Sequence, residues 1–114
     1  MNYKLTVAEA AKQLRGQSKL PFTIMMEHGT MSIEYFAPRE VDTQTPHKQD
    51  EIYVIIEGQS TFYRNGERMS CQKNDILFVP AGMEHHFENF SDDFATWVIF
   101  YGPEGGENKW SLSF

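Results

Sequence analysis

The chain lacks three features that would each place it in a particular class of protein: paired cysteines, a long hydrophobic run and a cluster of basic side chains. Its single cysteine, Cys71, cannot form an internal disulfide, which fits a reducing compartment. No apolar stretch approaches the ~20 residues of a membrane-spanning helix, and the N-terminal MNYKLTVAEA lacks a signal-peptide core. The formal net charge is −6 with no basic cluster, which disfavours nucleic acid and anionic membranes as partners. We therefore expect a cytoplasmic protein.

Aromatic and other hydrophobic residues are plentiful. They make up 14% and 40% of the 114 residues, a composition typical of a packed globular domain. A chain of this length buries roughly 65% of its unfolded surface, enough for one core. We predict two parts, an N-terminal helical extension over residues 1–19 and one β domain over residues 20–114.

Residues 6–16, TVAEAAKQLRG, are the one segment that predicts a helix. Thr6 and Glu9 have the spacing of a capping box, in which side chains satisfy free amide groups of the first turn. The apolar residues of the segment fall on one face, as expected of a helix that packs against a core.

The rest of the chain predicts β-strands. Eight segments have strand composition: 21–28, 30–37, 51–57, 60–64, 67–71, 75–79, 85–90 and 94–101. Turn signals separate them, and the strongest is Asn65-Gly66, because both residues accept the positive φ of a type I′ hairpin turn. Short strands that recur every 8–12 residues favour a β-sandwich or barrel.

Some strands are apolar on both faces. In EIYVIIE, residues 51–57, the two alternating sets of side chains are both largely hydrophobic. A strand buried on both faces needs a second layer outside the sheet. The N-terminal helix is expected to cover part of the outer face and a partner subunit the rest, so we predict a homodimer.

Two histidines and a glutamate stand next to predicted strands. His47 and Glu51 precede one strand, and His85 opens another after the tight turn at 80–82. Alternation places His85 on one face of its strand and His86 on the opposite face. The three residues are therefore either ligands that converge on a metal or, alternatively, a solvated turn and a core histidine.

The two stretches resemble the two motifs of the cupin superfamily. The histidine, glutamate and glycine of the first motif correspond to His47, Glu51 and Gly58. The second motif is matched by Pro80, Gly82, His85 and Asn89, with Asn74 where a glycine is usual. Fifteen residues separate Gly58 from Asn74, and the resemblance runs over roughly residues 20–103. It implies an all-β, jelly-roll-like cupin barrel with one short N-terminal helix.

The resemblance also implies one divalent transition metal held by His47, Glu51 and His85. Thr45 stands where the family usually has a further histidine. Gln49 is either an additional ligand or a hydrogen-bonding group beside the metal or substrate. Two imidazoles and one carboxylate suit Fe, Mn, Ni or Zn and leave open positions on the ion.

Three further residues are expected to face the barrel interior: Tyr53, Ile55 and Phe87. They would either line a pocket for a small, partly apolar organic molecule or simply fill the core. No glutamate is expected inside the site as a general base, because Glu57, Glu84 and Glu88 fall outside it. This favours chemistry centred on the metal.

The sequence thus predicts a metalloenzyme that acts on a small organic molecule, with dioxygenase, isomerase or lyase chemistry. The alternative is a non-catalytic cupin that binds or senses a small ligand. A purely structural barrel is disfavoured, because three polar groups inside it would carry a desolvation cost without a use.

Overall fold

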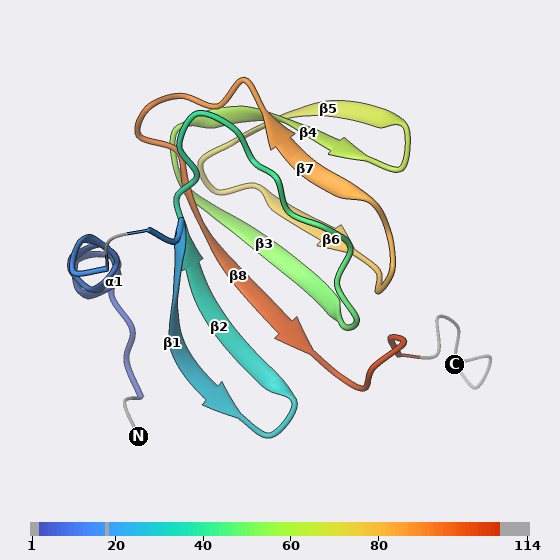
Figure 1. Ribbon diagram of the computed structural model, residues 1–114, viewed down its shortest axis with the longest axis horizontal. Coiled ribbons are helices and arrows are strands. Elements are labelled where there is room, and N and C mark those ends of the chain that lie inside the picture. Colours follow the sequence, from blue (N-terminus) through green and yellow to red (C-terminus); the bar gives the residue numbers. More distant parts are fainter. Residues whose placement is uncertain (1–2, 18, 108–114) are drawn as a thin grey trace.

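The structure is a computed structural model that describes residues 3–17 and 19–107 (Figure 1). It contains helix α1 (Val7–Arg15) and strands β1 (Phe22–His28), β2 (Met31–Phe36), β3 (Asp50–Glu57), β4 (Gln59–Arg64), β5 (Glu67–Gln72), β6 (Ile76–Val79), β7 (His85–Glu88) and β8 (Ala95–Tyr101). The predicted class, all-β with one short N-terminal helix, is confirmed. Residues 108–114 of the predicted β domain lie outside the described part of the chain.

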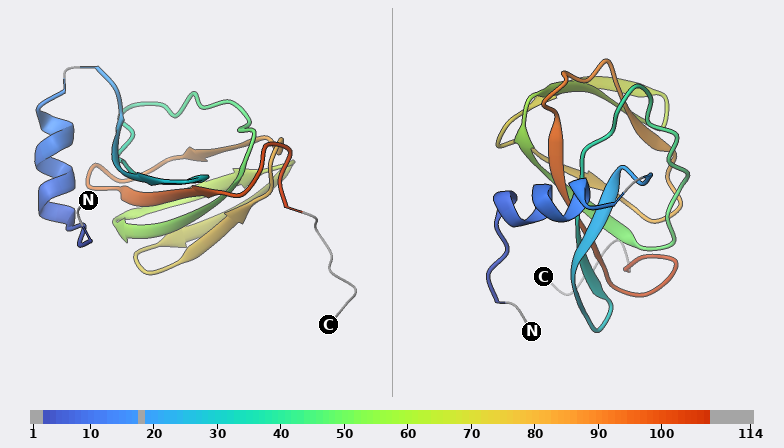
Figure 2. Two further views of the ribbon diagram at one scale, coloured as in Figure 1. Left: turned by 90° about the horizontal axis from the view of Figure 1, so that it is seen from below. Right: turned by 60° about the vertical axis from the view of Figure 1, so that its left-hand side comes forward.

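The strands form two antiparallel sheets that face each other (Figures 1 and 2). The larger sheet has the order β1-β2-β8-β3-β6, and the smaller has the order β5-β4-β7. The described strands are not hydrogen-bonded into one closed ring. The predicted jelly-roll-like barrel is therefore a pair of sheets whose inner faces are joined by side chains.

Aromatic side chains fill the space between the sheets. The ring of Phe87, from β7, lies 4.9 Å from the rings of Tyr53 and Phe94 and 5.1 Å from that of Phe62. Offset and edge-to-face contacts of this kind stabilise a core beyond the burial of apolar area alone. The high aromatic content of the chain is thus concentrated beside the predicted site.

Helix α1 begins at the predicted cap. The Thr6 hydroxyl accepts a hydrogen bond from the Glu9 amide (3.1 Å) and donates one to the Glu9 carboxylate (3.0 Å). Ala10 is fully buried and packs in a small cluster with Tyr35 and Ala95. Figure 2 shows the helix at one end of the larger sheet, so the expected partial cover of that sheet is confirmed. No helix in the described part of the chain is long and apolar enough to cross a membrane.

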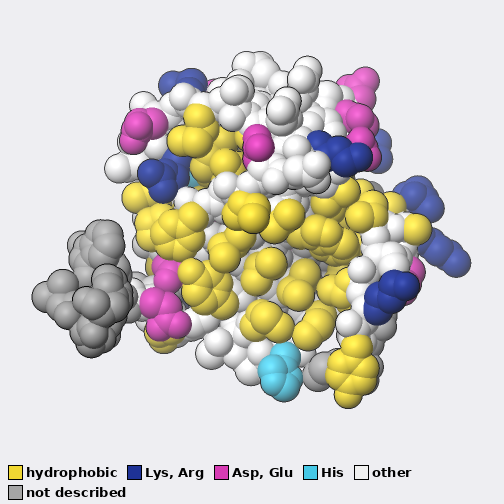
Figure 3. Space-filling view, turned by 180° about the vertical axis from the view of Figure 1, so that it is seen from behind, with side chains coloured by type: hydrophobic (Ala, Val, Ile, Leu, Met, Phe, Trp, Pro, Cys, Tyr) yellow, Lys and Arg dark blue, Asp and Glu magenta, His cyan; other side chains and the backbone are white. Residues whose placement is uncertain are grey.

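The remaining outer face of the larger sheet is apolar and uncovered within the described chain (Figure 3). Register places its side chains: Ile52 of β3 pairs with Phe78 of β6 and Ile99 of β8, and Val54 pairs with Ile76 and Trp97. Ile76 is 68% exposed and Phe78 is 46% exposed. A contiguous apolar face of this kind is typical of an interaction surface.

The glycine of the first motif can be tested by substitution. Gly58 has a φ of +77°, and a Cβ there would lie 2.8 Å from the Phe94 Cα. Gly58→Ala should therefore lower the free energy of unfolding by about 2–4 kcal/mol, from backbone strain plus overpacking. Gly66→Ala is the matched control, because Gly66 has a φ of +89° and open space around its Cβ position. Urea unfolding should show the larger loss at Gly58, and equal losses would contradict the close approach.

Candidate metal centre

The three predicted ligands come together between the sheets. His47 lies in the loop before β3, Glu51 is near the start of β3 and His85 opens β7. The Nε2 of His85 is 2.7 Å from the Glu51 Oε1, and the Nε2 of His47 is 3.9 Å from the same oxygen. One donor atom from each residue lies within 4.8 Å of the other two. Donors bound to one metal at about 2.1 Å lie roughly 3–4 Å apart, so the arrangement is close to that of a ligand set.

Glu51 and His85 are deeply buried, each about 1% exposed. Both carboxylate oxygens of Glu51 and the Nε2 of His85 lack a hydrogen-bond partner in the described structure. The 2.7 Å contact between them is short enough for a hydrogen bond, but the atoms are not aligned for one. Buried polar atoms without partners are costly to the fold. A divalent cation would satisfy all three atoms, so the residues present fit a metal.

The imidazole of His85 is oriented by the backbone. Its Nδ1 lies 2.8 Å from the carbonyl oxygen of Met83. A carbonyl only accepts, so Nδ1 carries the proton and Nε2 faces Glu51 as the metal-binding nitrogen. Burial lowers the pKa of His85, but the Glu51 carboxylate and the Met83 carbonyl outweigh it, and the net pKa is raised.

His47 stands at the more open side of the site, with 34% of its side chain exposed. Its ring packs edge-to-face on Phe100, with ring centroids 4.9 Å apart. Burial lowers the pKa of His47, and the neighbouring His85 lowers it further, although Glu51 and Asp42 act in the opposite direction. The lowered pKa favours the neutral imidazole, which is the form that binds metals.

Backbone contacts join the two motifs. The Gly82 amide donates to the His47 carbonyl (2.8 Å), and the Ala81 amide donates to the Asp50 carboxylate (2.9 Å). Gly82 has a φ of +80°, which glycine adopts without strain. The turn before β7 is therefore fixed against the loop that carries His47.

The structure adds a polar network that sequence reasoning missed. The Asp42 carboxylate accepts from the side-chain amide of Gln44 (2.5 Å) and from the backbone amide of Phe87 (2.9 Å). The Gln44 side-chain oxygen in turn accepts from the Tyr53 hydroxyl (2.9 Å) and lies 3.3 Å from the His47 Nε2. Asp42 thus sets the orientation of the Gln44 amide. Asp42 and Gln44 lie in an irregular loop, so the alternation of side chains along a strand could not predict which way they point.

A cavity of about 350 Å³ opens beside the three ligands. Tyr53 lines it, together with His47, Glu51 and the apolar side chains of Phe36, Val98 and Phe100. The other two residues predicted as pocket lining, Ile55 and Phe87, belong instead to the buried core cluster. A cavity of this size and mixed lining suits a small organic molecule.

Gln49 makes its described contacts away from the three ligands. Its side-chain nitrogen donates to the backbone carbonyls of Thr30 (2.8 Å) and Gly102 (2.9 Å). These bonds tie the loop before β3 to the β1–β2 turn and to the segment after β8. His86, predicted to face outward, does so: it stacks on Tyr63 and bonds with Glu88 at 2.8 Å.

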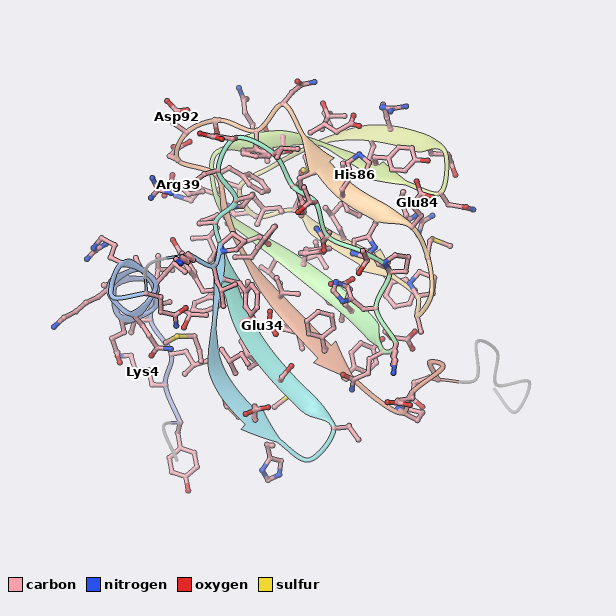
Figure 4. The ribbon with its side chains drawn as sticks, in the orientation of Figure 1. Lys4, Glu34, Arg39, Glu84, His86 and Asp92 are labelled. Atoms are coloured by element: carbon pink, nitrogen blue, oxygen red, sulfur yellow. The ribbon has the colours of Figure 1, made fainter. Side chains whose placement is uncertain are left out.

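A third acidic residue lines the cavity, besides Asp42 and Glu51. Glu34, on β2, points toward the inner side of the larger sheet, whereas Glu84 and His86 lie near β7 (Figure 4). Burial raises the pKa of Glu34 from 4.5 to about 7, and the negative charges of Glu51 and Glu27 add to the shift. The sequence feature that could have revealed this residue is the alternation in MSIEYF, which places Glu34 on the same inward face of β2 as Phe36. Glu34 places a proton-exchanging group in a site where none was predicted.

The raised pKa of Glu34 predicts a pH dependence of stability. The folded metal-free chain holds this proton more tightly than the unfolded chain, so its stabilising contribution is present below pH 4.5 and is lost as pH rises through about 7. Relative to wild type, Glu34→Gln should gain stability across that window and then level off. Urea unfolding in chelator measures this, with Glu67→Gln as control, because Glu67 is exposed on β5, in the other sheet. Parallel curves for wild type and Glu34→Gln would contradict the shift.

Comparisons with known proteins agree with this architecture. The family model for the cupin domain matches residues 32–101, more than half of the 114-residue chain. An uncharacterized protein of Streptomyces coelicolor is 29% identical over 104 residues, which cover 90% of this chain and 96% of that protein. The acireductone dioxygenase of Marinobacter nauticus is 33% identical over 84 residues, 69% of this chain and 43% of the enzyme. The chain thus spans less than half the length of that relative.

Solved structures show the same fold at low identity. KdgF from a Halomonas species has a TM-score of 0.62 at 18% identity, covering 69% of this chain and 74% of its own. A Cupin 2 conserved barrel domain protein from Salinispora arenicola has a TM-score of 0.61 at 14% identity, covering 90% and 89%. The family match, the two motifs in order and the shared fold lead to one conclusion: the chain belongs to the cupin family.

Proposed function

We propose that the chain is a metal-dependent enzyme in which His47, Glu51 and His85 hold one divalent transition metal and a small organic molecule binds in the adjoining cavity. The observation that carries this is the buried donor set, whose Glu51 oxygens and His85 Nε2 have no partner among the described residues. The cavity beside these atoms gives a substrate access to the ion's open positions.

The residues around the donor set have distinct tasks in this proposal. A bound metal supplies Lewis acidity or, if it is redox-active, chemistry with O2. Met83 keeps the His85 Nε2 aimed at the ion through the Nδ1 contact. Gln44 holds the Tyr53 hydroxyl at the cavity wall, and Phe100 packs against the ring of His47. These contacts would hold the groups that face the substrate in fixed positions.

Among the reaction types open to such a site, we favour dioxygenase chemistry over isomerase or lyase chemistry. Support comes from the partial similarity to acireductone dioxygenases, which covers 52% of this chain for one enzyme and 69% for another. Iron, nickel and manganese, as well as zinc, suit two imidazoles and a carboxylate. Metal identification in protein purified without a histidine tag, followed by oxygen-consumption screening with iron bound, tests this preference.

A pair of adjacent histidines tests the metal centre. The His85→Ala variant loses a buried ligand and should bind metal ~100-fold more weakly or worse. His86→Ala is the matched control, because that side chain stacks on Tyr63 on the outer side of the smaller sheet. Elemental analysis should find about one ion per chain in wild type and His86→Ala, and almost none in His85→Ala. A folded wild-type protein without metal, or equal metal content in both variants, would contradict the proposal.

We also propose a homodimer formed by the uncovered outer face of the larger sheet. The outward side chains at the centre of β3, β6 and β8 are all uncharged, including Ile52, Val54 and Phe78. A second copy offers the same apolar face and matches it about a two-fold axis. Standard dimer interfaces bury about 800 Å² on each partner, an area that such a sheet face can supply.

The dimer proposal predicts a specific disruption. Val54→Lys places a charge at the centre of the outer face and should shift the chain to a monomer, because an unpaired charge there would be desolvated on association. Thr61→Lys is the control: Thr61 pairs with Glu88 on the other sheet. Light scattering at several concentrations should give twice the chain mass for wild type and Thr61→Lys, and the mass of a single chain for Val54→Lys. A monomeric wild type would reject the proposed dimer.

We further propose that residues 20–114 form one cupin domain and that residues 1–19 are an extension docked on it through α1. Support comes from the packing of Ala10 against Tyr35 and Ala95.

We also propose that the protein works in the cytoplasm, without nucleic acid or membrane as a partner. The net charge of −6 and the single buried thiol of Cys71 support this.

A further inference from the structure

The carboxyl group of Glu34 faces the cavity and makes no hydrogen bond to another described residue. Its side chain lines the cavity from β2 (Figure 4), and no hydrogen bond or ion pair engages it within residues 3–17 and 19–107. The other two carboxyls of the cavity are committed. Asp42 accepts from Gln44 and Phe87, and Glu51 belongs to the ligand set. Glu34 is therefore available to a bound molecule.

The position of Glu34 relative to the metal ligands is fixed by strand register. Glu34 pairs with Val98 of β8, and Glu51 pairs with Phe100 two residues further along the same strand. Glu34 and Glu51 are thus on strands that flank β8, which places their backbones roughly 10 Å apart. A molecule about the size of a substituted six-membered ring can therefore contact Glu34 and the metal ligands at the same time.

The charges of the cavity restrict what can bind. Its described lining includes Glu34, Asp42 and Glu51 but no lysine or arginine. Lys48 and Glu104 lie outside, in an adjoining pocket that shares Glu34 with the cavity. An anionic group placed against Glu34 would meet like charge, and the described lining supplies no lysine or arginine to neutralise it there, which costs binding free energy. Apolar walls such as Phe22 and Phe36 favour a hydrophobic body.

We propose that Glu34 is the ligand-recognising carboxyl of this cavity, and that the ligand has an apolar body, a hydroxyl or amine that hydrogen-bonds to Glu34, and no negative charge at the end that faces Glu34. The inference rests on the proposed function, because the metal centre defines where the other end of the ligand lies.

The protonation behaviour of Glu34 is compatible with this role. With a pKa of about 7, raised by burial and by the charges of Glu51 and Glu27, the carboxyl both accepts from and donates to a ligand near neutral pH. When ionised, it makes the charge-assisted hydrogen bonds that are about twice as strong as neutral ones.

A matched pair of small probes tests the inference. Benzylamine and benzoate have the same ring and opposite charge, and their affinities for the zinc-free protein, in which benzoate has no ion to coordinate, can be measured by NMR titration. Wild type should bind benzylamine more tightly than benzoate. The Glu34→Gln variant should lose about tenfold in benzylamine affinity, the equivalent of a hydrogen bond to a charged group, with no loss for benzoate. Glu34→Asp, which keeps the charge, should retain the preference.

Glu104→Gln is the control, because Glu104 lines only the outer pocket. It should behave as wild type. The inference is overturned if benzoate binds wild type more tightly, if Glu34→Gln and Glu104→Gln behave alike, or if benzylamine does not bind. Zinc binding is measured separately by titration of the same preparations, so a failure of the metal centre is recognised independently of the charge preference of Glu34.

Discussion

The buried contact between Glu51 and His85 is the constraint on which the site depends. A carboxylate and an imidazole lie 2.7 Å apart at about 1% exposure, with three polar atoms lacking hydrogen bonds in the described structure. In the low dielectric of an aromatic core, such atoms destabilise the metal-free fold. A ligand that satisfies them binds the folded state and not the unfolded one, so it stabilises the fold by mass action. Metal binding at the proposed site would therefore raise the stability of the fold.

The three candidate ligands are positioned by two strands from different sheets and by one loop. β3 carries Glu51 from the larger sheet and β7 carries His85 from the smaller one, so the facing sheets bring the two together. The third ligand, His47, is in a loop and needs separate anchors: the Gly82 amide on its carbonyl and Phe100 against its ring. The carboxyl that we propose for ligand recognition, Glu34, is displaced from this cluster, on the far side of β8. The apolar outer face lies on the opposite side of the same sheet, which separates the proposed dimer contact from the chemistry.

Most of the fold could be predicted from sequence, because it follows from periodicity, whereas the candidate ligand set followed from the resemblance to the two cupin motifs. Alternation in HHFE separated the buried His85 from the outward His86, and Asn65-Gly66 marked the β4–β5 turn. Asn74, which stands where the family has a glycine, has a φ of +77° that asparagine tolerates, so the departure leaves the turn intact. The residues that sequence reasoning missed are ones whose positions do not follow from local alternation. Asp42 and Gln44 lie in a loop without periodicity, and the position of Glu34 in the cavity depends on long-range pairing of β2 with β8.

The central claim is that His47, Glu51 and His85 bind one metal ion. Anomalous diffraction from crystals of the native protein, collected at the absorption edge of the metal found by elemental analysis, tests it most directly. The account predicts one strong anomalous peak about 2.0–2.2 Å from a nitrogen of each histidine and from a Glu51 oxygen. A peak elsewhere, or a well-ordered site in which these atoms are satisfied by water alone, would contradict it.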